Sequence, residues 1–238
     1  SKQVKRFFLK NNKVTFIENN LIDNIFKFQN KKKLPFYSLN KKITGESHER
    51  KISKVLSHLK KYNCDYMLVT APENIAWLLN IRGHDNPTSP IPNSFLIISK
   101  KKKIFLIVEK YKTKRLVREK KLNIKQIIAP KNISNFLNNL DTGNILIDEK
   151  TCSIFLEKIL TKRFKVIKQE DPIYFLKSIK NNIEINNMIK THIIDGVALT
   201  KFIYWLKNKT KLNLTEVDAQ NKLENFRKKK FKIFISKL

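Results

Sequence analysis

The residues best suited to chemistry gather around a single glycine. Arg82, His84 and Asp85 surround Gly83, directly after an apolar segment that starts at Glu73. A guanidinium, an imidazole and a carboxylate this close together can bind charged groups and can reach toward a neighbouring active site. The alternative is a solvated turn whose charges satisfy each other in an internal salt bridge. We take Arg82, His84 and Asp85 as a candidate active-site-rim loop and keep both interpretations open.

No other set of residues has the spacing of a metal site or of a nucleophile with its base. The four histidines include no close His-x-x-His pair, and the two cysteines, Cys64 and Cys152, form no Cys-x-x-Cys pair. His192 falls on an apolar helical stripe, where we expect a packed side chain rather than a ligand. Asp141 and Asp148 flank a predicted strand and are too far apart for a catalytic pair. The isolated glycines exclude a phosphate-binding loop. The sequence therefore predicts no catalytic, cofactor-binding or metal-binding residue in this chain.

The charge and the apolar content of the sequence limit the kinds of partner that we expect. The net charge is +30, and lysine supplies nearly all of it, because only 7 of the 50 basic residues are arginine. The lysines are spread along the whole chain without a nucleic-acid-binding motif, so we expect no specific nucleic-acid partner. No run of about eighteen apolar residues occurs, so we expect no membrane partner. Both cysteines lie beside apolar segments, and we expect buried free thiols in a reducing cytoplasm.

From Ser47 onward the hydrophobic pattern is regular. Ser47 can cap a helix whose apolar residues Ile52, Val55, Leu56 and Leu59 recur at helical spacing, and Pro72 suits the first turn of a second helix. Apolar runs on both sides of Lys100–Lys103 predict a hairpin with an exposed turn. This alternation of helices and strands predicts an α/β sandwich with a mixed sheet. Other predicted strands lie at 14–17, 66–69, 126–128, 145–147 and 164–167, and other predicted helices at 20–26, 110–121, 132–140 and 152–160.

Beyond this block the sequence predicts two helices. The first is a long amphipathic helix over 181–208 with an apolar stripe. Thr215 and Asp218 have the spacing of a weak capping box at the start of the second. No predicted strand remains to cover their apolar faces, and six or seven large side chains left uncovered forfeit on the order of 10 kcal/mol.

Several segments resemble, in order, an Xaa-Pro aminopeptidase of the creatinase/aminopeptidase P-like metallopeptidase family. Their joint order and spacing make the resemblance specific, since each of them alone is short. The segments are Lys13–Asp23, Ile43–Ser47 with Lys51 and Ile52, Ala76–Gly83 with Asp85 and Pro90, and Lys180–Arg227 with Glu184, Met188, His192 and Asp195.

The resemblance implies a fold and a domain order. The fold is a creatinase N-terminal-like α/β sandwich with a mixed sheet, followed by the first helices of an incomplete pita-bread α+β domain. Residues 1–45 would be the end of a first domain and a linker, 46–172 the whole non-catalytic middle domain, and 173–238 the truncated start of the catalytic domain. After Arg227 the likeness ends in a lysine-rich tail, for which we expect a frameshift or a fragmentary gene.

The resemblance also implies an activity. An intact family member removes the residue that precedes proline at the N-terminus of a peptide, and it holds two divalent metals, usually manganese. Its ligands would lie beyond the matching residues, so we expect no cofactor in this chain and no activity of the chain alone. The implied partners are peptides with proline second, for the intact protein, and a possible homodimer. The alternatives are a stand-alone non-catalytic binding or dimerisation module and a non-specific basic nucleic-acid binder.

Overall fold

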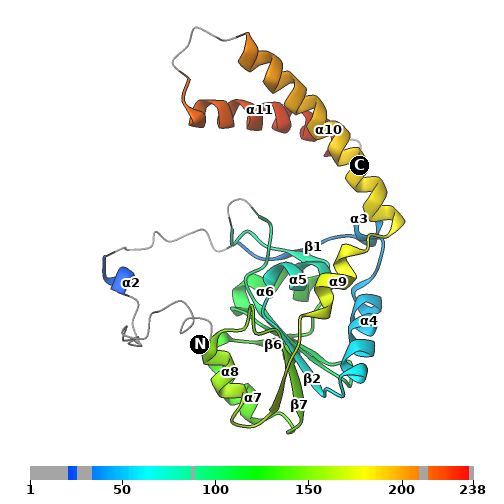
Figure 1. Cartoon of the computed structure of the whole chain (residues 1–238), viewed down its shortest axis with the longest axis vertical. Helices are drawn as coiled ribbons and strands as arrows, with labels where there is room; N and C mark the ends of the chain where they lie inside the picture. Colours follow the sequence, from blue (N-terminus) through cyan, green and yellow to red (C-terminus); the bar gives the residue numbers. More distant parts are fainter. Residues whose placement is uncertain (1–20, 26–33, 87–88, 209–213, 236–238) are drawn as a thin grey trace, which may run out of the picture. The chain divides into compact units, whose positions relative to one another are not determined.

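The computed structural model describes residues 21–25, 34–86, 89–208 and 214–235 (Figure 1). These residues form two compact units. The first contains the residues up to Leu39 together with Ser47–Ser178, and the second contains Asn40–Glu46 together with the residues from Ile179 onward. The chain therefore passes between the two units three times, and a short early segment belongs with the last part of the chain.

The beginning of the chain contributes little regular structure to this description. The short helix α2 (Leu21–Ile25) confirms the helix predicted at 20–26. The strand predicted at 14–17 lies outside the described residues. The domain ranges 1–45, 46–172 and 173–238 stay a prediction, because a compact unit of packing need not coincide with a domain of a family.

The first unit is built on a six-stranded mixed sheet with the strand order β6-β5-β4-β2-β7-β8. Only β4 runs against its neighbours in this sheet, β2 and β5, whereas the other adjacent pairs are parallel. The carboxyl ends of the other five strands therefore share one edge with the start of β4. The predicted mixed sheet is confirmed. The strands are β2 (Tyr66–Val69), β4 (Phe95–Ser99), β5 (Ile104–Ile107), β6 (Ile127–Ile128), β7 (Asn144–Ile147) and β8 (Lys165–Lys168).

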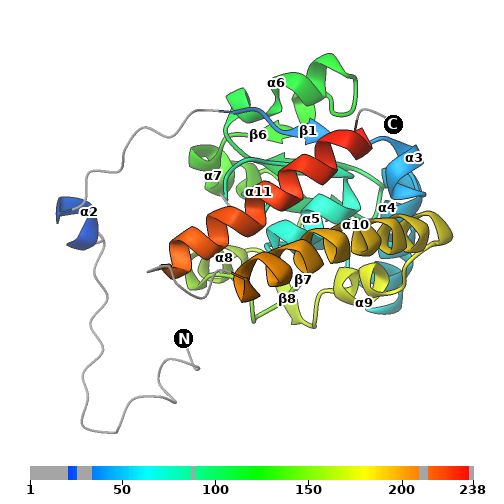
Figure 2. The same ribbon diagram turned by 90° about the horizontal axis from the view of Figure 1, so that it is seen from above.

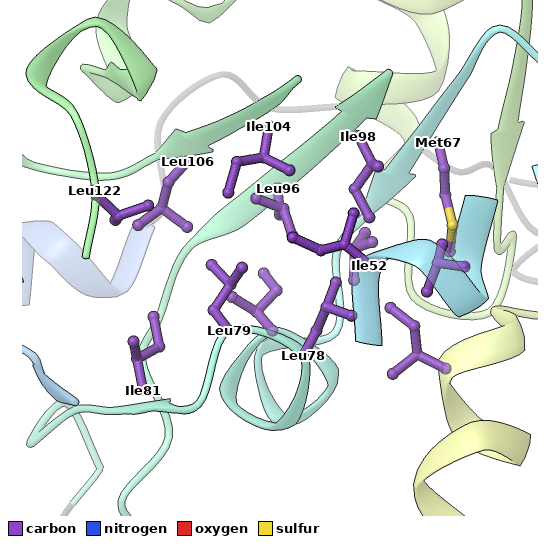
Figure 3. Close-up of a cluster of buried hydrophobic side chains, with 14 of the residues drawn as sticks. Ile52, Met67, Leu78, Leu79, Ile81, Leu96, Ile98, Ile104, Leu106 and Leu122 are labelled. Atoms are coloured by element: carbon purple, nitrogen blue, oxygen red, sulfur yellow. The ribbon is translucent and has the colours of Figure 1, made fainter. Parts of the chain in front are cut away.

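Helices cover both faces of this sheet, because side chains along a strand alternate between its faces. On β2, Met67 and Val69 belong to one cluster of buried apolar side chains, while Tyr66 and Leu68 belong to another. Figure 3 shows the first cluster, in which Leu78 lies near Ile52 and the strand residues. The first cluster is completed by α4 (His48–Lys61), α5 (Pro72–Leu78), α6 (Lys110–Arg118) and α9 (Pro172–Ser178), and the second by α7 (Ile133–Asn138) and α8 (Ile154–Leu160).

Local signals place some of the helix ends in this unit. The hydroxyl of Ser47 accepts a hydrogen bond from the backbone N–H of Arg50, so Ser47 caps α4 as predicted. Of the apolar positions predicted for α4, Ile52, Val55 and Leu59 are buried, and Leu56 is partly buried against the same cluster. Helix α6 ends at Arg118, three residues before its predicted end, because Lys120 adopts a left-handed φ of 54°. The predictions for α7 and α8 were likewise too long by a few residues.

The predicted hairpin is confirmed, and a second strand pair was not predicted. In the hairpin Leu96 lies opposite Leu106, and Lys102 takes a left-handed φ of 64° in the exposed turn. The second pair joins β1 (Tyr37–Ser38) to β3 (Ile81–Arg82) in antiparallel register. Strands of two residues have no periodicity, which is why the sequence gives no sign of them.

The second unit consists of α3 (Lys41–Thr44), α10 (Asn182–Lys207) and α11 (Glu216–Ile235). The helices α10 and α11 lie side by side (Figures 1 and 2). The guanidinium of Arg227 on α11 donates to both carboxylate oxygens of Asp195 on α10, at 2.7 and 3.2 Å. The capping box before α11 is confirmed, since the N–H of Asp218 donates to the Thr215 hydroxyl at 3.2 Å and the N–H of Thr215 donates to the Asp218 carboxylate at 3.1 Å.

The apolar stripe of α10 is exposed. Met188, Ile189 and Ile193 keep 44%, 55% and 63% of their surface accessible. His192 is exposed with them, so the expectation of a packed imidazole is wrong. It fails because, in the described part of the chain, no layer covers the stripe that His192 shares. Even so, none of the described helices is long and apolar enough to cross a membrane.

Candidate functional site

The candidate loop begins at the end of β3, where Gly83 brings two stretches of backbone together. The N–H of Gly83 donates to the carbonyl oxygen of Pro90 at 3.1 Å. A Cβ atom at Gly83 would lie 2.9 Å from the carbonyl oxygen of Ile91 and 2.9 Å from the Cα atom of Pro92. These distances are shorter than van der Waals contact, so the close-packed backbone would have to shift. Glycine is therefore required at this position for space, and it fixes where the charged residues on either side lie.

Arg82 turns toward the protein interior. Its Nη1 donates to the carbonyl oxygens of Ala76 at 3.0 Å and Ile81 at 2.9 Å. Burial lowers the pKa of the guanidinium, and the neighbouring Tyr37 acts in the opposite direction. The contact with Ala76 places a positive charge at the carboxyl-terminal turn of α5, where the exposed carbonyl groups favour a cation. Arg82 therefore fastens the loop to α5.

Asp85 forms the internal salt bridge of the second interpretation. Its Oδ1 lies 2.6 Å from Nζ of Lys112 on α6, and its Oδ2 accepts a hydrogen bond from the N–H of Asn93 at 2.8 Å. The two charged side chains are only 14% and 16% exposed. His84 is exposed, and its ring centre lies 5.3 Å from that of Tyr37. Of the three candidates, His84 is the one presented to solvent, and the role of the loop as an active-site rim stays a prediction.

A cavity of about 450 Å³ adjoins this loop, at the edge of the sheet where β2, β5 and β6 end and β4 begins. Two partners of Asp85, namely Asn93 and Lys112, line it, so the salt bridge helps to fix its wall. Ligands of open α/β sheets bind outside the carboxyl ends of the strands, and the volume suits a small organic molecule. The lining offers both a carboxylate, Glu109, and an ammonium, Lys112, beside apolar walls that include Phe95. The arrangement can hold a small ligand, but it selects neither sign of charge.

Metal-binding chemistry finds no support among the described residues. They contain no group of three or more His, Cys, Asp and Glu side chains that could hold a metal ion. They therefore do not fit the pair of metals that the family resemblance implies. Asp141 and Asp148 lie before and after β7, with Asp141 exposed and Asp148 buried.

The two thiols are not activated nucleophiles. Cys64 is buried, Cys152 is half-buried, and both are unpaired with each other. Burial raises the pKa of Cys64, and burial together with nearby Glu157 raises the pKa of Cys152 to about 11. A raised pKa disfavours the thiolate, which is the reactive form. The expectation of buried thiols is confirmed for Cys64 and holds in part for Cys152.

Sequence reasoning missed a buried lysine that joins two of the motif segments. The ammonium of Lys51 donates to Oδ1 of Asn80 at 2.8 Å and to the carbonyl oxygen of Trp77 at 3.0 Å, and it lies 4.2 Å from the centre of the Trp77 ring. Trp77 itself packs against the core, as expected. The available signal was spacing, because Lys51 precedes Val55 and Leu59 at intervals of four on the inward stripe of α4.

A second polar group, which we call the Asp171 cluster, was also missed; three of its members are buried and Lys177 is half-buried. It consists of Asn74, Asp148, Asp171 and Lys177. These residues come from α5, the end of β7, the residue before α9, and α9 itself. Its members are separated by as many as 103 residues in the chain, so no local pattern could bring them together.

Comparison with known proteins agrees with the motifs. Residues 29–184 match the creatinase/prolidase N-terminal domain family. The chain is 30% identical to Xaa-Pro aminopeptidase 1 of Dictyostelium discoideum over 223 residues, and 32% identical to Xaa-Pro aminopeptidase ApepP of Drosophila melanogaster over 230 residues. These alignments cover 88% and 91% of this chain, but only 35% and 36% of the relatives.

Solved structures share the fold. An X-prolyl aminopeptidase from Caenorhabditis elegans, described as a cytosolic enzyme with a di-nuclear active site, superimposes with a TM-score of 0.76 at 23% identity. That match covers 89% of this chain and 36% of the other. The prolidase from Pyrococcus horikoshii gives a TM-score of 0.57 at 20% identity, covering 75% of this chain and 48% of the other.

Proposed function

The chain belongs to the creatinase/prolidase N-terminal domain family, and from this premise we propose that it is a fragment of an Xaa-Pro aminopeptidase that is inactive alone. The supporting observation is that curated relatives with this activity in their names align along most of the chain. We further propose that residues 1–45 end a first domain, that 46–172 form the middle domain, and that 173–238 begin the catalytic domain. The chain spans about a third of these relatives, so the activity belongs to the longer protein.

The proposed reaction of the longer protein is removal of the residue that precedes proline at the N-terminus of a peptide. Its substrates would be peptides with proline second, and its setting the cytoplasm. Two divalent metals, with manganese as our choice, would activate a water molecule and polarise the scissile carbonyl. Since the described residues offer no ligand set for them, we propose that residues outside this part supply it. A homodimer is the proposed assembly.

Within that protein the loop after β3 is the proposed rim of the active site. Arg82 and Asp85 hold the loop to α5 and α6 through contacts inside the first unit. His84 is exposed, so it is the side chain of this loop that could contact a peptide or a neighbouring domain. In this proposal Arg82 and Asp85 position the loop, and His84 alone faces outward.

The test is a peptidase assay of this chain with and without manganese. We expect no release of the first residue from a peptide with proline second, and less than one bound metal per chain by elemental analysis. A full-length relative serves as the positive control, and a peptide with alanine second controls for contaminating peptidases. Manganese-dependent release by the pure chain, specific for the proline peptide, would contradict the proposal.

A further inference from the structure

Helix α9 is a short element held on the first unit by two apolar side chains and several polar contacts. Ile173 is fully buried, and Leu176 packs against the same apolar cluster. Phe175, on the other side of the helix, keeps 63% of its surface exposed. Seven residues are too few for a helix that is stable by itself in water. The position of α9 therefore depends on what holds it to α5 and to the end of β7.

The polar contacts of α9 form a hydrogen-bonded chain that passes through one buried side-chain amide. The side chain of Asn74 on α5 donates to Oδ2 of Asp171 at 2.7 Å, and its oxygen accepts from Nζ of Lys177 at 2.6 Å. The other oxygen of Asp171 caps the helix by accepting from the N–H of Ile173 at 2.8 Å. The N–H of Asp171 in turn donates to Asp148 at 3.1 Å. One carboxylate thus contacts both α5 and the first turn of α9.

Other charged groups face this carboxylate from the elements packed around it. Asp148 comes from the end of β7, Lys177 and Tyr174 come from α9, and Glu73 on α5 accepts from the Tyr174 hydroxyl at 3.0 Å. Burial raises the pKa of Asp171 to about 6, and Asp148 adds to the rise. The hydrogen bonds from Asn74 and the Ile173 N–H oppose it, as does the charge of Lys177. Burial also raises the pKa of Tyr174 to about 12.

We propose that the Asp171 cluster is a proton-controlled latch for α9, which docks more tightly in mild acid than above neutral pH. Undocking returns the Asp171 carboxyl to water, where its pKa takes the ordinary value of 3.8. The docked state then binds the proton more strongly than the undocked state. By linkage, the docking advantage is fully present at low pH and is lost as the pH rises through about 6. Between pH 7.5 and pH 5.0 the docking equilibrium should change by about tenfold.

Release of α9 would have a mechanical consequence. It is the last helix of the first unit, and the chain enters the second unit directly after Ser178. An undocked α9 would add its seven residues to the connecting segment. The latch would therefore set the length of the connection between the units through the protonation of one side chain.

Hydrogen exchange of the whole chain tests the latch. Protection of the amides in 173–178, corrected for the intrinsic effect of pH on exchange, should be about tenfold higher at pH 5.0 than at pH 7.5. In Asp171→Asn this ratio should fall to near one. Asp141→Asn removes an exposed carboxylate and should leave the ratio as in the wild type. Equal ratios in wild type and Asp171→Asn would overturn the latch.

Two further measurements distinguish the latch from global unfolding and from a variant that does not fold. Peptides from β4 should keep their protection while α9 changes, and a parallel change there would indicate global unfolding and overturn the proposal. If Asp171→Asn does not fold, carbon-13 NMR of the wild-type carboxyl groups replaces it. A midpoint for Asp171 near its ordinary value would also overturn the latch, whereas a clearly raised midpoint supports it. None of these readings depends on peptidase activity.

Discussion

A lysine ammonium in a core must be matched by acceptors, and Lys51 is matched by one side-chain and one backbone oxygen. In Lys51→Met the aliphatic volume is nearly kept, but Asn80 and the Trp77 carbonyl lose this donor. A buried acceptor that loses its partner costs about 1–3 kcal/mol, so we expect the free energy of unfolding to fall by about 2–4 kcal/mol. Urea unfolding measures the loss, with Lys60→Met on the exposed side of α4 as the control. Equal losses in the two variants would show that the Lys51 contacts contribute nothing.

Two glycines provide a matched pair in which the same change should have opposite effects. At Gly83 a methyl group would meet backbone at 2.9 Å, whereas at Gly196 in α10 it would meet nothing within 4 Å beyond its own helix among the described residues. Gly83→Ala should lower the free energy of unfolding by about 1–3 kcal/mol. Gly196→Ala should stabilise α10 by up to about 1 kcal/mol, since alanine is the better helix former.

Each glycine variant has its own fluorescent reporter. Trp77 lies in the first unit and Trp205 in the second, so single-tryptophan backgrounds follow the two units separately during denaturation. A stabilising effect of Gly83→Ala would disprove the argument from space.

The residues that sequence reasoning missed share a physical property. Lys51 and Asn74 are polar but buried, and their hydrogen-bond partners lie 29 and 97 residues away. Periodicity reports which face of an element is buried, but it does not name a partner on another element. The loop residues Arg82, His84 and Asp85 could be found because glycine and charge mark turns locally.

At the scale of elements, the start of α10 depends on the segment that precedes the middle block. Oδ1 of Asn181 accepts from the N–H groups of Ile183 and Glu184, both at 3.0 Å, and its amide donates to the carbonyl oxygen of Thr44 at 2.9 Å. Gly45 has a φ of 71°, and a Cβ atom there would collide with the Asn181 side chain. The early motif segment therefore docks on a helix more than a hundred residues later.

Asn181→Ala should weaken both partners of this contact. Loss of an N-cap costs about 1–2 kcal/mol, which corresponds to exchange of the amides in 182–186 and 42–45 about 5–30 times faster. Hydrogen exchange measures both segments in one experiment. Asn186→Ala, on the exposed side of α10, is the control. Faster exchange in 182–186 alone would mean that the helix is capped by Asn181 but that α3 does not depend on it.

Elements that are marked by residues close together in the sequence were predicted, whereas elements that depend on distant contacts were not. The hairpin was predicted well because two apolar runs flank an exposed turn, and α4 because a serine cap directly precedes an apolar pattern of helical spacing. The β1–β3 pair and the grouping of Asn40–Glu46 with α10 were not predicted, because they are set by contacts across the chain. The end of α6 was placed three residues too late, because the left-handed Lys120 follows the end of the helix at Arg118.

At the scale of the whole molecule, the class of fold followed from alternation, but the order of the strands did not. The sequence neighbours β5 and β6 are adjacent in the sheet, whereas β6 and β7 lie four places apart. The sequence also predicted an uncovered apolar face on the long C-terminal helix, and apolar residues of α10 are exposed among the described residues. Large apolar side chains become buried only where another layer covers them. Because no strand is predicted after 164–167, the exposure of the apolar stripe of α10 could be foreseen.

The sheet order has a consequence while the protein is being made. Strand β2 can pair early with β4, but Tyr66 of β2 meets Ile145 of β7 only after most of the first unit has been synthesised. Ribosomes add about 5–20 residues per second, so one edge of the central strand waits for several seconds with its backbone groups unpaired. An open edge of apolar strand invites pairing with other chains. The nascent chain is therefore most open to such pairing during that interval, and faster elongation between β4 and β7 would shorten it.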